Sequence, residues 1–348
     1  MGMVLLLVVG GCESLSYYAQ SVNGHLSLMA ERTDIDSLLS DPDTDASLRE
    51  KLARVHAIRE FASAELGLPD NDSYRTYVDV GSAYVVWNVV AAPEFSLQPE
   101  TWCFLVVGCL SYRGYYQRSA ADNFAEPYRE RGYDVYVGGS QAYSTLGWFD
   151  DPLLSTMLGH TEAQLAAVVF HELAHQVLYI DDDTAFNEAF AVVIEREGVA
   201  RWLVQHSDQG ALEAFTVSQA RNRHFIEILL AGRSRLKILY EEDLQPAVMR
   251  ERKRSILASV KEHYEASDAG EEYAGWFHTE LNNAKLALVA TYWVWVPAFQ
   301  HILGEHGGDL ESFYAAVEQL SLHPASERHA YLDSLTVRRL SQLRLVPR

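Results

Sequence analysis

The sequence predicts an α+β protein that is predominantly helical, with a small mixed or antiparallel sheet in its first half and a helical second half. Two observations lead to this prediction. The segments that we expect to be strands, which are rich in Tyr, Val and Trp, lie before residue 140. After residue 160 almost every segment carries apolar residues at helical spacing. Strands that are segregated from helices in this way are typical of the α+β class.

The first half alternates between the two kinds of element. Residues 47–66 have helical spacing, and the turn residues 67–70 end that helix. A second helix is expected over residues 114–131. Gly138 and Gly139 are expected to end the last strand, because glycine weakens a strand interior. The expected strands cover residues 74–80, 84–91, 101–107 and 133–137.

The second half should consist of long helices packed on one another. We expect a signal peptide at residues 1–11 and a single domain at residues 12–348, whose mixed portion ends at residue 160 and whose helical portion covers residues 161–348. The strongest helical patterns cover residues 161–179, 183–206, 212–239, 247–266 and 280–303.

The charge balance argues against nucleic-acid binding. The chain has 28 Lys and Arg against 48 Asp and Glu, so its formal net charge is −20. Nucleic-acid binders need a basic surface, and no basic run dominates this sequence. No stretch reaches the ~20 apolar residues that a membrane-spanning helix requires.

The first residues resemble a bacterial lipoprotein signal. The apolar run from Met3 to Val9 has signal-peptide length, and Val9-Gly10-Gly11-Cys12 resembles a lipobox. Cleavage before Cys12 would leave a lipidated cysteine that anchors the protein to a membrane. Glu13, in place of Asp, favours the outer membrane, facing the periplasm. A buried N-terminal strand is the alternative. Because the acidic surface would repel anionic headgroups, association should depend on the acyl chains.

Cys103 and Cys109 flank an apolar run that is expected to be one strand. On a straight strand they would lie roughly 20 Å apart. A disulfide needs Cα atoms within ~7 Å. We therefore expect two buried thiols, unless Gly108 turns the chain sharply.

The chemistry is concentrated in a motif of the form H-E-x-x-H. His171 and His175 are four residues apart on a predicted helix, so both imidazoles lie on one face about one turn apart. This spacing suits one Zn²⁺ ion, and Glu172 is placed to take a proton from a water at that ion. Two core histidines without a metal are the alternative, but they would leave buried polar groups to satisfy.

A third ligand is expected on the next helix. Glu188 lies in its first turns and is the preferred candidate. Glu195, seven residues on, could instead hydrogen-bond a ligand histidine, as metal-site histidines usually require. Its alternative role is an exposed ion pair with Arg196 or Arg201. Asn187 is a further candidate for a hydrogen bond to the ligands.

The developing oxyanion of a hydrolytic reaction needs a hydrogen-bond donor besides the metal. The candidates are Tyr112, Tyr143, Tyr292 and His278. Arg113 could bind a substrate carboxylate, although a structural ion pair is an equal alternative.

Together, His171-Glu172-x-x-His175 and Asn187-Glu188-x-Phe190-Ala191 resemble the gluzincin metallopeptidases. After residue 12 the chain is similar to a family of bacterial lipoproteins described as putative zinc aminopeptidases. This resemblance implies a zincin-like fold, zinc ligands at His171, His175 and Glu188, and Glu172 as general base. It also implies that an edge strand, residues 133–137 or 141–147, pairs with an extended peptide substrate.

Two features differ from the aminopeptidase N type. Only twelve residues separate His175 from Glu188, and a Gly-x-Met-Glu-Asn segment is absent from the sequence. We expect zinc-dependent peptide-bond hydrolysis with one zinc ion by an aminopeptidase, and an endopeptidase is the alternative that these two differences leave open. The alternatives from other classes are a non-hydrolytic zinc-binding envelope lipoprotein, acting as a scaffold or assembly factor, and a zinc reservoir.

Overall fold

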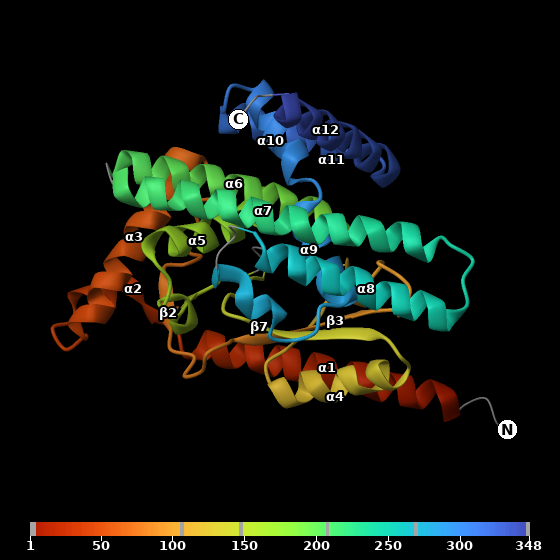
Figure 1. Cartoon of the computed structure of the whole chain (residues 1–348). Helices are drawn as coiled ribbons and strands as arrows, with labels where there is room; N and C mark the ends of the chain where they lie inside the picture. Colours follow the sequence, from red (N-terminus) through yellow and green to blue (C-terminus); the bar gives the residue numbers. More distant parts are fainter. Residues whose placement is uncertain (1–4, 105–107, 146–148, 207–208, 268–270, 346–348) are drawn as a thin grey trace.

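The computed structural model describes residues 5–104, 108–145, 149–206, 209–267 and 271–345. Within them the protein is predominantly helical with small sheets, as the α+β prediction requires. Figure 1 shows the long helices α6 (Thr184–Gln205) and α7 (Gln209–Tyr240) above the strands β3 (Val86–Ala92) and β7 (Asp134–Ser140). Helices α1 (Leu5–Ala30) and α4 (Arg118–Glu130) lie below these strands.

The N-terminal segment is helical. Helix α1 begins at Leu5 and passes through Cys12, so the alternative of an N-terminal strand is wrong. Residues 1–4 and the side chain of Cys12 lie outside the described part, and the lipobox stays a prediction. Short elements β1 (Thr33–Asp34) and α2 (Ile35–Ser40) lead to α3 (Ala46–Leu66). Helix α3 ends where predicted, because Gly67 adopts the left-handed conformation, φ 66°, that terminates helices.

The larger sheet is antiparallel and has the strand order β6-β3-β7, where β6 is Arg113–Tyr115. Strand β7 is therefore at an edge. The expectation that Gly138 and Gly139 end this strand is wrong, because both pair with β3. The packing of Tyr84 requires a glycine at position 139, because a Cβ there would lie 2.4 Å from the ring of Tyr84. The predicted helix at residues 114–131 begins only at Arg118, because Gly114 belongs to β6.

A second sheet has the order β1-β2-β8, where β2 is Thr76–Val78 and β8 is Leu153–Leu154. Strands β2 and β8 are parallel and β1 and β2 are antiparallel, so this sheet is mixed.

The expectation of two separate thiols is wrong. Strands β4 (Trp102–Phe104) and β5 (Gly108–Leu110) form an antiparallel pair in which Cys103 faces Cys109, and the two residues form a disulfide. The straight-strand assumption fails because the chain reverses between the two strands. Gly108 has φ 70°, a conformation that glycine adopts readily. Residues 105–107 of the predicted strand lie outside the described residues.

The second half contains the expected helices with small shifts in their bounds. The predicted helix at residues 280–303 is two helices, because Pro297 lies in the first turn of α10 and cannot donate a backbone hydrogen bond to the preceding helix. The 3₁₀ turn η1 (Ser155–Met157) precedes α5, the first helix of this half. The elements are α5 (Glu162–Val177), α6, α7, α8 (Pro246–Glu265), η2 (Glu271–Phe277), α9 (Asn283–Trp293), α10 (Val296–Glu305), α11 (Leu310–Ser321) and α12 (Ala325–Leu345).

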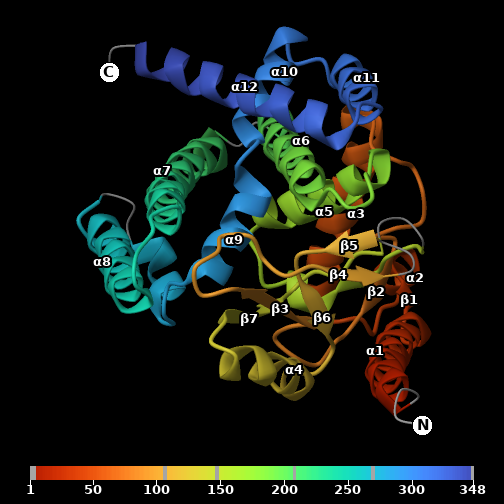
Figure 2. The same cartoon turned by 90° about the vertical axis from the view of Figure 1, so that its right-hand side faces the viewer.

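The main core lies where α3, α5, α6 and α10 meet. Phe170, Phe186, Phe190 and Phe299 are fully buried there. A second core joins α7, α8 and α9. Helix α9 contacts α6, α7, β3 and β7, and Figure 2 shows it between the long helices and the sheet. It therefore connects the helical half to the strands.

The segment Asn283–Glu305, which covers α9 and α10, is long and apolar enough to cross a membrane by length and composition alone. On composition, the expectation of no such segment is therefore wrong. However, 56% of the 18-residue stretch of this segment that meets the test is buried inside the structure, and core helices of soluble proteins pass the same test. One such segment is weak evidence for a membrane span.

Replacing Gly198 on α6 by Ala should destabilise the protein. A Cβ there would lie 2.7 Å from both Leu66 Cδ1 and Phe170 Cδ2, which are fully buried and cannot move away. We expect Gly198→Ala to lower the free energy of unfolding by about 1–2 kcal/mol in urea denaturation. The control is Gly304→Ala on α10, an exposed position with open space, which should gain about 0.5 kcal/mol from helix propensity. Equal stabilities would contradict the close packing of α6 on α3 and α5.

Candidate metal centre

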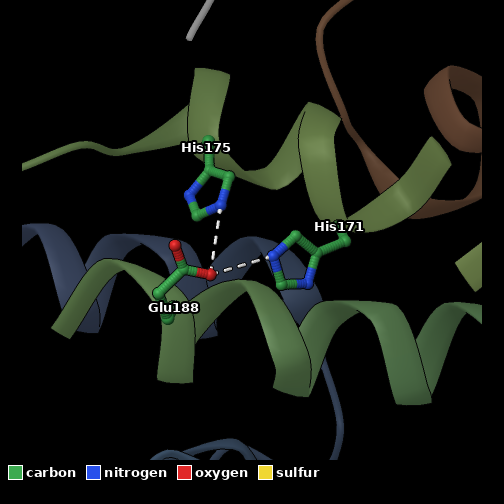
Figure 3. Close-up of side chains that lie close together, drawn as sticks. All are labelled: His171, His175 and Glu188. Carbon is green, nitrogen blue, oxygen red and sulfur yellow. Dashed lines mark hydrogen bonds and ion pairs between the residues drawn. The ribbon is translucent and has the colours of Figure 1, made fainter. Parts of the chain in front are cut away.

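Helix α5 presents the two histidines. It begins with a capping box: Thr161 Oγ1 accepts from the Gln164 backbone N–H, and the Gln164 side chain accepts from the Thr161 N–H. Leu165, Val169 and Leu173 are buried in the main core. His171 and His175, one turn apart, are directed toward α6, as Figure 3 shows.

A turn that is fixed by side-chain hydrogen bonds brings α6 back beside α5. The side chain of Asn187 accepts a hydrogen bond from the Ile180 N–H at 2.9 Å and donates one to the Ile180 carbonyl at 2.8 Å. Asp183 caps α6 by accepting from the Phe186 N–H. Asn187 therefore holds the turn, and none of its described hydrogen bonds goes to a histidine. This turn determines where the neighbouring Glu188 lies.

Glu188 lies between the two imidazoles (Figure 3). Its Oε2 atom is 3.1 Å from His171 Nε2 and 3.7 Å from His175 Nε2. His175 and Glu188 are buried, with 5% and 6% of their surface exposed. Two nitrogen atoms and one carboxylate oxygen thus converge on one small volume.

Glu195 holds the other side of His171. Its Oε2 atom is 3.0 Å from His171 Nδ1. The alternative pairing with Arg201 is not formed, because Arg201 pairs with Glu197 at 2.8 Å. A proton on Nδ1 that is directed at Glu195 leaves Nε2 of His171 available toward Glu188.

The protonation of the centre follows from burial and from these pairs. Burial lowers the pKa of His171, but the hydrogen bonds to Glu188 and Glu195 outweigh it and raise that pKa well above its ordinary value. Burial lowers the pKa of His175 to about 4. Burial raises the pKa of Glu188, but the hydrogen bond to His171 and the two imidazole charges leave it below its ordinary value. Burial raises the pKa of Glu172 to about 7.

The three side chains could hold a metal ion, because their ligand atoms lie within 4.8 Å of one another. A tetrahedral zinc ion that bonds its ligands at ~2.0–2.1 Å separates them by roughly 3.4 Å, close to the distances between Glu188 and the two histidines. Two imidazoles and one carboxylate are also a known ligand set of catalytic zinc. His175 Nδ1 is buried and has no hydrogen-bond partner among the described residues.

Three tyrosines surround Glu188. The ring of Tyr292 stacks beside His171 at 6.4 Å, and its hydroxyl donates a hydrogen bond to Glu188. Burial and the nearby charge of Glu188 raise the pKa of Tyr112 and Tyr292 well above the ordinary value. Tyr179, which the sequence did not single out, lies 6.3 Å from His175 between ring centroids. Burial raises the pKa of Tyr179 to about 12, so all three hydroxyls stay protonated.

The structure places the other candidate donors elsewhere. Tyr143 packs against His25 and Tyr116. The guanidinium of Arg113 lies 3.9 Å from the ring centroid of Tyr17, between α1 and α4. His278 is exposed after η2. None of these three has a described contact with the two histidines or Glu188.

Glu172 has partners that the sequence did not indicate. Ser144 hydrogen-bonds to it, and the charge of buried Asp151 helps to raise its pKa. Asp151 accepts from the Thr145 N–H at 2.8 Å and from the Ser144 hydroxyl at 3.3 Å. Tyr74, at φ 65°, is fully buried beside this group, and its backbone N–H donates to the Asp151 carbonyl at 2.7 Å. Only the folded chain brings these residues to Glu172, and no motif marks them.

A cavity of about 330 Å³ adjoins the centre. It lies between β7, α7 and α9, and Tyr112 and Tyr292 form part of its wall. Since both tyrosines also lie beside Glu188, the cavity and the three converging side chains share a wall.

Comparison with known proteins gave one match. The model of a protein family described as "Putative aminopeptidase" matches residues 16–332. This range includes His171, His175 and Glu188 as well as the residues around the cavity. Neither the search of curated proteins nor the search of solved structures found a match.

Replacing Asp151 by Asn should change how stability depends on pH. Burial raises the pKa of Asp151 to about 6 from 3.8, so the folded state holds this proton more tightly than the unfolded state does. The resulting stabilisation is complete below pH 4 and is lost as the pH rises through 6. We expect Asp151→Asn to gain up to about 3 kcal/mol relative to wild type across this window. Asp150→Asn, at the exposed neighbour, is the control.

Urea denaturation at pH values from 4 to 7 measures the difference. A constant gap between Asp151→Asn and wild type across this range would contradict the raised pKa.

Proposed function

This chain belongs to the putative aminopeptidase family, and we propose that it is a zinc-dependent hydrolase of peptide bonds. The observation that carries the proposal is the convergence of His171, His175 and Glu188, with Glu172 beside them. These residues come from two consecutive helices, the arrangement expected of a zincin-like metallopeptidase. A purely structural zinc site would use a fourth protein ligand and would have no need of a buried glutamate next to it.

His171 and His175, through imidazole nitrogens, and Glu188, through a carboxylate oxygen, would hold the ion. Zinc in such a site lowers the pKa of a water molecule to about 7 and polarises the carbonyl that the water attacks. Glu195 keeps His171 in the tautomer that binds metal, and Asn187 keeps Glu188 in place through the turn.

Glu172 is the general base. A proton acceptor works best when its pKa is near the working pH, and burial raises the pKa of Glu172 to about 7. Glu172 accepts a proton from the attacking water and passes it to the leaving amine as the peptide bond breaks. Ser144 hydrogen-bonds to Glu172 and so orients it.

Tyr292 is the best-placed donor for the oxyanion. Its ring lies beside His171, its hydroxyl reaches Glu188, and its raised pKa keeps the hydroxyl protonated. Tyr112 is the second candidate, since it also lies near Glu188. In either case the phenol donates a hydrogen bond to the oxygen that gains charge in the transition state.

Strand β7 offers a place for the peptide main chain. It is an edge strand of its sheet, and Gly138, Gly139 and Ser140 line the cavity beside the centre. An extended peptide that pairs with β7 would run past the candidate centre.

Two substitutions test the chemistry separately. Glu172→Gln should keep zinc and lower kcat by roughly 10²–10⁴-fold, because only the base is lost. Glu188→Ala should lower zinc affinity by more than roughly 100-fold, because it removes a ligand. Zinc content by elemental analysis and cleavage of free and N-acetylated peptides measure both effects. Loss of cleavage on N-acetylation would identify an aminopeptidase.

Glu197→Ala is the matched control for Glu188→Ala. Glu197 is on the same helix, but it pairs with Arg201. If Glu188→Ala binds zinc as tightly as this control does, Glu188 is not a ligand. If wild type cleaves no peptide with zinc bound, the non-hydrolytic alternative holds.

Tyr292→Phe and Tyr112→Phe should identify the oxyanion donor. We expect Tyr292→Phe to lower kcat by roughly 10²-fold at saturating zinc, with KM little changed, because the lost hydrogen bond forms only in the transition state. Tyr112→Phe should have the smaller effect. Stopped-flow kinetics and zinc titration of both variants measure this. If Tyr292→Phe weakens zinc binding and leaves kcat unchanged, its role is to hold Glu188.

A further inference from the structure

We infer that the cavity beside the candidate centre binds one large, uncharged side chain of the substrate, preferably an aromatic one, next to the bond that is cleaved. This inference rests on the proposed peptidase function. It adds a substrate class, which neither the zinc-binding motif nor the family description provides.

The position of the cavity ties it to the reacting centre. Tyr292 lines the cavity, hydrogen-bonds to Glu188 and stacks beside His171. Tyr112 lines the same cavity and lies near Glu188 and Glu172. A single layer of side chains therefore separates the cavity from the candidate ligands. A peptide whose carbonyl carbon lies at the centre would place an adjacent side chain in this space.

The lining selects an apolar ring. Phe225 stacks on Tyr273 with a ring-centroid distance of 4.4 Å, and Trp276 lies edge-on to Phe225 at 5.8 Å. Trp293 and Leu288 of α9 also line the cavity. Aromatic rings favour further rings in offset or edge-to-face contact. Such a lining stabilises a Phe, Tyr, Trp or Leu side chain by removing its apolar surface from water.

The lining also disfavours charge. Among the described residues that line the cavity, none is Asp, Glu, Lys, Arg or His. A charged side chain would lose its water without gaining a partner, which is costly. Arg196 lies behind the wall: it donates to Asn222 Oδ1 at 3.0 Å and stacks on Trp293 at 4.6 Å. Its positive charge adds a penalty for Lys and Arg side chains.

Asn222 supplies one polar contact. Because its Oδ1 atom is occupied by Arg196, its Nδ2 group remains the donor available to the cavity that Asn222 lines. An uncharged acceptor, such as a peptide carbonyl or a Tyr hydroxyl, can receive that hydrogen bond.

The volume suits one residue. A cavity of 150 Å³ is known to hold a benzene molecule, so about 330 Å³ accommodates a phenyl or indole group. The space is at the lower end of the range for ligand pockets, which indicates one side chain of a longer substrate.

A peptide panel tests the inference on the wild-type protein. Free X-Ala-Ala-Ala peptides and N-acetylated Ala-Ala-X-Ala-Ala peptides carry Phe, Trp, Leu, Ala, Asp or Lys at X, so that X adjoins the cleaved bond for an aminopeptidase and for an endopeptidase, and mass spectrometry locates that bond. We expect cleavage next to Phe, Trp or Leu with kcat/KM at least roughly 100-fold above that for Ala, Asp or Lys. Equal rates for Phe, Ala and Asp would overturn the inference and leave the peptidase function standing.

Leu288→Trp tests the location of the selectivity. Leu288 is half-buried on α9, so an indole there would fill the cavity. The Phe-to-Ala ratio of kcat/KM should fall by at least roughly 10-fold. Ile238→Trp, which places the same residue at a position 65% exposed on α7, should leave the ratio unchanged. An unchanged ratio in a folded Leu288→Trp protein would place the selectivity elsewhere.

Binding can be measured without turnover. Trp276 and Trp293 line the cavity, so the Phe peptide, tested with a free and with an acetylated N-terminus, should change the tryptophan fluorescence of Glu172→Gln, and the Asp peptide should not. If the Phe peptide binds in this way but wild type cleaves no peptide, the pocket assignment is supported and the proposed peptidase function is contradicted. If neither peptide changes the fluorescence, the pocket assignment fails.

Discussion

The packing of α5 against α6 places one carboxylate between two imidazoles, and the rest of the centre depends on this contact. A buried carboxylate is costly unless a positive charge or several hydrogen-bond donors compensate it. Glu188 obtains this compensation from His171, whose pKa is raised, and from the Tyr292 hydroxyl. A divalent cation would supply the same compensation more strongly. The three converging side chains could therefore hold a cation in place of the proton on His171.

Two features from the first half of the chain support the turn between α5 and α6. The Cys109 N–H of the disulfide-linked hairpin donates to Asp182 Oδ1 at 2.6 Å. A Cβ at Gly108 would lie 2.7 Å from the same oxygen, so the hairpin contacts the turn closely. Asp182 has φ 64° and directly precedes Asp183, the cap of α6. The disulfide thus restrains a hairpin that contacts the start of the helix carrying Glu188.

Local sequence patterns predicted what depends on local spacing. The positions of the helices and the candidate ligand helix follow from residues close in sequence, and the structure has a long helix at Glu188. Features that depend on distant contacts could not be predicted. The hairpin of Cys103 and Cys109 requires a chain reversal that its apolar run does not signal. The pairing of Gly138 in β7 depends on β3, about 50 residues earlier. The contacts of Asp151 with the surroundings of Glu172 depend on loop residues that come together only in the folded chain.

Helix α9 links the proposed side-chain pocket to the candidate centre because it contributes residues to both. Its residues Leu288 and Trp293 line the cavity, while Tyr292 extends to Glu188 and His171. The start of the helix is tied to β7: the Asn283 N–H donates to Asp134 Oδ2 at 2.7 Å, and Lys253 Nζ lies 2.6 Å from the same oxygen. Two elements that line the cavity, α9 and β7, are therefore tied to each other at the start of α9. A substrate side chain that fits between them would position its carbonyl relative to Tyr292 without a rearrangement of the protein, which is how a rigid site converts binding energy into rate.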